Sequence, residues 1–164
     1  MERLVKANSF PYVQGGFSDV TAAGEDVLSL DLLNRGVGPA HEESLRVKVG
    51  GQYMKSLEEL ISASLGPEET ATAMPALKAH LLRNGLKRRF IPGGQQQFVF
   101  SIAKTPENAQ FWDLLDKASK RWDIEYCYCS IFQECWWVRG IWSEPEPVKQ
   151  CQRDESREFF PGPQ

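Results

Sequence analysis

Four cysteines carry the most recognisable chemistry in the sequence, and all of them lie in its last quarter. They are Cys127, Cys129, Cys135 and Cys151. Their spacing of one, five and fifteen intervening residues differs from the Cys-x2–4-Cys pairs of structural zinc sites, so we expect no metal site. Buried free thiols and redox chemistry remain alternatives to disulfides. Because the number is even, oxidised pairs are favoured, and they would place the domain outside the cytosol.

The pairing of the cysteines follows from the strands that carry them. Residues 123–131 and 135–142 read as the two strands of a hairpin. If residues 131–133 form its turn, Cys129 lies opposite Cys135, and Cys127 lies opposite Trp137. We therefore expect a Cys129–Cys135 bridge. Cys127–Cys151 is a weaker second pair, because Cys151 sits in a tail that looks irregular.

Residues for general acid, base or nucleophilic catalysis are scarce. Histidine occurs only at positions 41 and 80, as His41 and His80, and either reads as a surface or turn residue. No Gly-x-Ser-x-Gly nucleophile motif is present. Adjacent carboxylates do not face each other on a helix or a strand; these pairs are Glu42-Glu43, Glu58-Glu59 and Glu68-Glu69. We expect no catalytic residue and no cofactor, with a sandwich enzyme using His41 or carboxylates as the alternative.

Aromatic side chains crowd into a short stretch of the second half of the chain. They are Trp112, Trp122, Tyr126, Tyr128, Phe132, Trp136, Trp137 and Trp142. Neighbouring strand residues point to opposite faces, so Trp136 and Trp137 cannot share one small core. Core packing accounts for most of the set. A candidate binding patch for a protein, peptide or glycan contains four of these aromatic residues; they are Trp136, Trp137, Trp142 and Tyr128.

The overall charge gives no reason to expect nucleic acid as a partner. The chain has 164 residues and a formal net charge of −3, which does not attract a polyanion. One basic cluster is formed by Arg83, Lys87, Arg88 and Arg89. It reads as a solvated strand edge guarded by charge, with contact to anionic lipid headgroups as the alternative.

Alternating apolar residues predict the fold class. Residues 27–33, 45–49 and 98–102 each place apolar side chains at every second position, which is typical of half-buried strands. Helices are expected from Ser56 to Leu65 behind a capping box, over residues 75–82, and from Thr105-Pro106 to Trp122.

About seven short strands with a few helices favour a mainly β domain. We expect an Ig-like antiparallel β-sandwich with two or three short helices in its connections. The sandwich would span residues 10–142, after an N-terminal arm over residues 1–9. An irregular C-terminal tail would cover residues 143–164.

Several short motifs resemble one group of proteins. Five segments carry the resemblance. They are the stretch Val5–Val13, the turn Asn34-x-Gly-x-Gly-Pro-Ala40, the hairpin Val47–Gly51, the turn Ile91–Gly94 and the segment Tyr128-Cys129-Ser130-x4-Cys135-Trp136. This order of motifs is similar to that of uncharacterised bacterial membrane-anchored proteins. The resemblance implies a transmembrane helix upstream of Met1 and a domain on the periplasmic side of the inner membrane. It implies no enzymatic activity.

These expectations combine into one functional hypothesis. The chain is expected to be the extracytoplasmic domain of a membrane-tethered protein that binds a partner or supports an assembly without catalysis. The partner would be a protein, a peptide or a glycan. A more specific alternative is that the domain is a carbohydrate- or peptide-binding module that uses exposed tryptophans.

Overall fold

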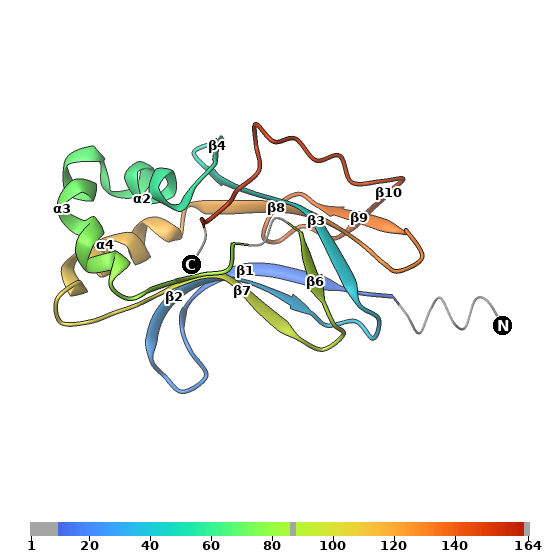
Figure 1. The fold of residues 1–164 in the computed structure, drawn as a ribbon, viewed down its shortest axis with the longest axis horizontal. Helices are drawn as coiled ribbons and strands as arrows, with labels where there is room; N and C mark the ends of the chain where they lie inside the picture. The colour runs from blue at the N-terminus through green and yellow to red at the C-terminus, as the bar shows by residue number, and fades with distance from the viewer. Residues whose placement is uncertain (1–9, 86–87, 163–164) are drawn as a thin grey trace.

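The chain folds as a β-sandwich in which two antiparallel sheets pack face to face (Figure 1). The computed structural model describes residues 10–85 and 88–162. Strands predominate, and three helices gather at one end of the sandwich, on the left in Figure 1. The mainly β sandwich with a few short helices is therefore confirmed.

The two sheets have different sizes and different edges. The smaller has the order β1 (Val13–Val20), β2 (Asp26–Asn34), β7 (Gln96–Ala103) and β5 (Leu81–Arg83). The larger has the order β10 (Glu146–Val148), β9 (Cys135–Val138), β8 (Trp122–Cys129), β3 (Ala40–Val49) and β4 (Gln52–Met54), and β6 (Arg89–Ile91) also pairs with β3. In the smaller sheet, β1 and β5 are thus the opposite edge strands.

The expected alternation places the core between the sheets. Leu28, Leu30 and Leu32 of β2 are buried, as the period of two predicts. On β7 the alternation differs from the prediction, because Phe98 is 50% exposed while Val99 is buried. The β2–β7 register shifts between Leu30 and Asp31. Such a shift turns the side chains beyond it to the other face of the sheet.

Three helices lie in the connections between strands and cover one end of the sandwich (Figure 1). They are α2 (Leu57–Leu65), α3 (Pro67–Lys78) and α4 (Ala109–Ser119). The predicted cap of α2 is present: the Glu59 backbone N–H donates to Ser56 Oγ. The helix expected over residues 75–82 is displaced, since α3 begins at Pro67 and is followed by β5. A proline is favoured in the first turn of a helix.

The prediction for the third helix is wrong at both ends. α4 begins at Ala109 rather than at Thr105-Pro106, because Thr105 and Asn108 close a local turn first. The Thr105 N–H donates to Asn108 Oδ1 at 2.7 Å, and the Asn108 N–H donates to Thr105 Oγ1 at 3.2 Å. At the other end, Trp122 starts β8 and does not belong to the helix.

The C-terminal segment is more ordered than an irregular tail. It contributes β10 to the larger sheet, and Glu158 and Phe159 are buried. The Phe159 N–H donates to the Leu45 carbonyl at 2.9 Å, and its ring lies 6.1 Å from that of Phe100. Residues 149–162, drawn in red in Figure 1, therefore form part of the packed domain. We call them the C-terminal strap.

Within the described residues, every helix is too short or too polar to cross a bilayer.

Candidate functional site

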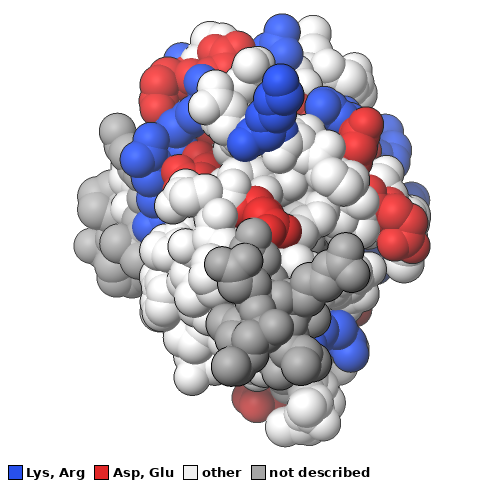
Figure 2. Space-filling model, turned by 90° about the vertical axis from the view of Figure 1, so that its right-hand side faces the viewer, with Lys and Arg blue, Asp and Glu red and all other residues white. Residues whose placement is uncertain are grey.

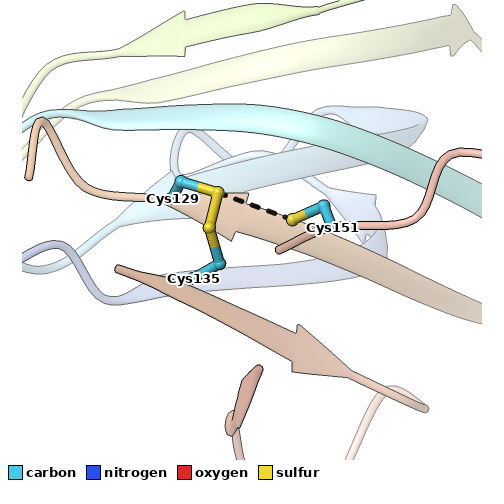
Figure 3. A group of neighbouring side chains, drawn as sticks. All are labelled: Cys129, Cys135 and Cys151. Atoms are coloured by element: carbon cyan, nitrogen blue, oxygen red, sulfur yellow. Dashed lines mark hydrogen bonds between the residues drawn. A yellow bond between two sulfur atoms is a disulfide. The ribbon is translucent and has the colours of Figure 1, made fainter. Parts of the chain in front are cut away.

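Both cysteine pairs expected from the sequence are joined in the structure. Cys129 is bonded to Cys135 and Cys127 to Cys151, each with an S–S distance of 2.08 Å. The register of β8 and β9 sets Cys129 opposite Cys135 and Cys127 opposite Trp137, as the predicted hairpin requires. Figure 3 shows Cys151 beside the first bridge, with its Sγ 3.6 Å from Cys129 Sγ.

The two bridges have different structural roles. Cys129–Cys135 closes the β8–β9 hairpin at its turn, with a sequence separation of 6. Cys127–Cys151 fastens the C-terminal strap to the middle of the larger sheet. The sulfurs of Cys129, Cys135 and Cys151 lie within 4.8 Å of one another. A metal would need thiolates, so these residues could serve as its ligands only after reduction of the bridges.

A buried charge network also holds the C-terminal strap in place. Arg46 Nε lies 3.0 Å from Glu158 Oε2, and its other nitrogens donate to Glu125 at 3.2 Å and to the Gln152 carbonyl at 2.8 Å. Ser44 Oγ donates to the Glu158 carboxylate at 2.8 Å. Desolvation acts to raise the pKa of Glu125, but the hydrogen bonds from Tyr53 and Arg46, together with the charges of Lys48 and Arg46, lower it overall. The network satisfies charges that burial would otherwise penalise.

The four residues of the aromatic patch do not share an exposed surface. Tyr128 is 1% exposed and Trp137 is 5% exposed, so both belong to the packed interior. Trp136 is half-buried, with its ring 5.5 Å from Tyr128 and 5.8 Å from Phe10. Trp142 is 95% exposed. Of the patch, Trp142 alone has the exposure that a binding surface needs.

The histidines and acidic pairs are distributed over the molecule. The His41 ring packs edge-on against Phe90 at 5.2 Å, on paired strands of the larger sheet. His80 is exposed at the turn between α3 and β5. Glu43 and Glu58 form ion pairs with Arg88 and Arg83. These groups therefore act in local ion pairs and ring packing, and they do not converge on one site.

Glu42, which forms an ion pair with Arg89, has a strongly raised pKa. It is fully buried on β3, where its Oε1 lies 3.1 Å from Arg89 Nη1. Its Oε2 and the Arg89 Nε have no hydrogen-bond partner among the described residues. Desolvation raises the pKa of Glu42 to about 7, although Arg89 opposes the shift. The pair is a polar element within the sandwich.

The predicted basic cluster is divided by its acidic partners. Arg89 is buried against Glu42, Arg88 pairs with Glu43, and Arg83 binds Glu58 and the Pro161 carbonyl. Lys87 lies outside the described residues. Figure 2 views one end of the sandwich and shows basic and acidic side chains interspersed over its upper part. On the described part of this face, the charges are therefore of mixed sign (Figure 2).

A cleft of about 520 Å³ lies beside the edge strand β1. Its lining includes residues 12–19 around β1, and residues 138 and 141–145 from the end of β9 and the loop after it. Trp122 and Tyr126 of β8 also line the cleft, as do Ser119 and Lys120 at the end of α4. Phe17 packs edge-on against Trp122 at 5.2 Å. We call this concavity the β1 cleft; its wall includes the exposed Trp142.

Tyr126 closes one end of the β1 cleft by binding the strand edge. The Gly15 N–H donates to Tyr126 Oη at 2.9 Å, and that hydroxyl donates to the Val13 carbonyl at 3.0 Å. Burial raises the pKa of the Tyr126 hydroxyl, so it stays protonated. A Cβ on Gly15 would come within 2.9 Å of Ile124 and 3.0 Å of the Tyr126 ring. A side chain at position 15 would therefore force Ile124, Leu32 or Tyr126 to shift.

The polar groups of the β1 cleft are unequally paired. Lys120 Nζ lies 2.9 Å from Asp19 and 3.8 Å from Asp116, so two carboxylates share one ammonium. The hydrogen bond from Lys120 lowers the pKa of Asp19, whereas desolvation and the neighbouring Asp19 raise that of Asp116. Glu144 is exposed and forms no ion pair within the part of the chain that the structure describes.

Sequence reasoning did not identify the β1 cleft. The strand beside it, β1, continues through Gly15 and Gly16 to Val20. The usable signal was the glycine pair itself, since glycine within a strand marks a close approach of another group.

Comparison of the chain with protein-family models, with curated proteins and with solved structures finds no match.

Proposed function

We propose that this chain is an extracytoplasmic domain that binds a partner in the β1 cleft without catalysing a reaction. The resemblance of its motifs to membrane-anchored bacterial proteins supports a tether and a periplasmic location. The partner would then be a molecule of the periplasm or a segment of another membrane-tethered protein.

The cysteines support the compartment. All four are paired, and two bridges in a domain of this size are typical of proteins that fold in an oxidising environment. Cytosolic thiol reductants would keep the same residues reduced.

The single observation that carries the binding function is the composition of the β1 cleft. It has a volume of about 520 Å³, within the range of ligand sites, and it combines apolar and aromatic walls with a few polar groups. Trp142 is 95% exposed at this site, which is unusual for a tryptophan that has no binding role. The histidines lie elsewhere, so the lining favours recognition over acid–base chemistry.

The compartment is tested by trapping thiols in intact cells that express the full-length protein. Alkylation before and after reduction should find all four cysteines protected until a reductant is added. The protein should also fractionate with membranes and be digested by protease in spheroplasts. Four free thiols in the native host, or protection from the external protease, would contradict the proposal.

The binding site is tested by comparing two alanine variants, one in the β1 cleft and one at the opposite edge of the smaller sheet. Trp142→Ala removes the exposed ring of the β1 cleft. Leu82→Ala removes an exposed apolar side chain on β5, at the far edge. Binding to arrays of short peptides and oligosaccharides should be lost in the first variant and kept in the second. Binding that survives Trp142→Ala unchanged would move the site elsewhere.

A further inference from the structure

Resting on the proposed function, we propose that the ligand of the β1 cleft is an extended peptide with a Lys or Arg side chain. The peptide adds to the free edge of β1 through main-chain hydrogen bonds. Its basic side chain lies beside Trp142 and Glu144. This mode of recognition is β-strand addition.

The first argument is the direction of the β1 backbone groups. In an antiparallel ladder, alternate residues point their N–H and C=O groups towards the partner strand or away from it. The Gly15 N–H points away from β2, because it donates to Tyr126. Phe17 lies two residues further along β1, so its N–H and C=O point the same way. By this alternation neither group takes part in the β1–β2 ladder, and neither has a hydrogen bond outside the ladders within the described residues.

The free edge faces the β1 cleft and is short. At one end, the Tyr126 hydroxyl is hydrogen-bonded to the Val13 carbonyl and the Gly15 N–H. At the other end the register with β2 shifts between Ser18 and Val20. The Gly15 carbonyl and both groups of Phe17 are left for a ligand. Three groups suit a short extended segment, and they are too few to recruit a long strand by themselves.

Gly16 lines the β1 cleft and leaves open space beside the strand. A Cβ at this position would meet no atom within 4 Å, so packing does not explain the glycine. Its φ lies outside the left-handed region, so conformation does not require it either. The strand is therefore unobstructed at this position.

The charge of the β1 cleft selects the side chain of the ligand. Among the lining residues, Lys120 pairs with Asp19, and Glu144 adds a carboxylate without a cation. The excess is negative, so it favours a cationic ligand. Trp142 offers a free indole face from the same loop, and an indole is the best aromatic partner of an ammonium or guanidinium.

A neutral glycan would use the same indole but would not need the strand edge. Stacking on Trp142 and hydrogen bonds to carboxylates would satisfy a sugar ring. The unpaired main-chain groups of Phe17 would then stay without a partner. The test therefore compares both ligand classes on one protein.

The experiment uses capped pentapeptides with a central Lys, Arg, norleucine or Glu and varied flanking residues, beside neutral oligosaccharides. Binding is followed by the amide shifts of Phe17 and the indole N–H shift of Trp142. We expect Lys and Arg peptides to bind, with about tenfold weaker affinity for norleucine. N-methylation of the ligand should weaken binding at alternate backbone positions only, because alternate N–H groups face β1.

Variants of the protein complete the test. Glu144→Gln should remove the preference for Lys over norleucine, and Leu82→Ala should keep it. Glycan binding at Trp142 without peptide binding would overturn the peptide inference and leave the proposed function standing. Uniform sensitivity to N-methylation, or none, would also overturn it. If neither class shifts Trp142, both the inference and the binding function of the cleft fail.

Discussion

The C-terminal strap and the β1 cleft differ in how they treat the exposed parts of the two sheets. The strap covers the outer face of the larger sheet and satisfies its charges, with Arg46 bound to two carboxylates and a backbone carbonyl. The β1 cleft leaves backbone groups of an edge strand and a whole tryptophan ring open to solvent. One region is closed within the chain, whereas the other has unfilled hydrogen-bonding and apolar capacity.

This difference separates stability from function. Buried charges held by several partners are expensive to disrupt, because a change leaves an unpaired charge in a region of low dielectric. Exposed residues without such partners contribute little to stability, and their conspicuous chemistry calls for another explanation. The comparison therefore predicts large losses of stability from the strap and small losses from the β1 cleft.

Glu158→Gln should produce the largest loss of stability. It leaves Arg46 buried with an incomplete set of partners, which costs about 3–5 kcal/mol in comparable pairs. The free energy of unfolding is measured by denaturant titration. Glu144→Gln, the matched exposed change, should cost less than about 0.5 kcal/mol. Equal effects of the two variants would remove the distinction between the regions.

Removal of the Cys127–Cys151 bridge should follow in size. By loop-closure entropy, its separation of 24 residues corresponds to about 3.5 kcal/mol. The separation of 6 for Cys129–Cys135 corresponds to about 2.4 kcal/mol. Paired Cys→Ser variants, compared by thermal and denaturant unfolding, should rank in that order. The reverse order would show that the strap is held chiefly by its other contacts.

The Glu42–Arg89 pair should make stability depend on pH. The pKa of Glu42 is about 7 in the folded state against an ordinary value of 4.5. Folding therefore favours the protonated acid, and its contribution is complete below pH 4.5 and lost as the pH rises through 7. The difference in unfolding free energy between the native chain and Glu42→Gln should fall by up to about 3 kcal/mol across this window. A constant difference would place the pKa of Glu42 near its ordinary value.

The smallest effects on stability are expected at the β1 cleft. Trp142→Ala and Glu144→Gln should each change the free energy of unfolding by less than about 0.5 kcal/mol, since both side chains are exposed. Ligand binding should nevertheless be lost or weakened in both. A strong loss of stability in Trp142→Ala would instead make that ring part of the packing.

The sequence predicted the closed parts of the molecule better than the open part. Period-two patterns located β2 and β3, and strand alternation set the register that pairs Cys129 with Cys135. These features depend on local spacing. The β1 cleft depends on the distance between β1 and residues 138–145, which no local pattern encodes.

Tertiary contacts also explain why the aromatic patch was misplaced. Strand alternation correctly separated Trp136 from Trp137, but it could not show that the strap covers the face on which Trp137 lies. Arg46 packs over the Trp137 ring at 4.8 Å, and the same guanidinium binds Glu158 of the strap. The exposed member, Trp142, follows β9 in a loop without periodicity.

Amide hydrogen exchange in the free domain tests the open edge of β1 most directly. The N–H groups of Gly16 and Ser18 point towards β2 and should exchange slowly, and Gly15 should be protected by Tyr126. The Phe17 amide should exchange much faster than these neighbours and become protected when a basic peptide is added. Slow exchange of Phe17 in the free domain would show that this edge is already closed, and would contradict the account.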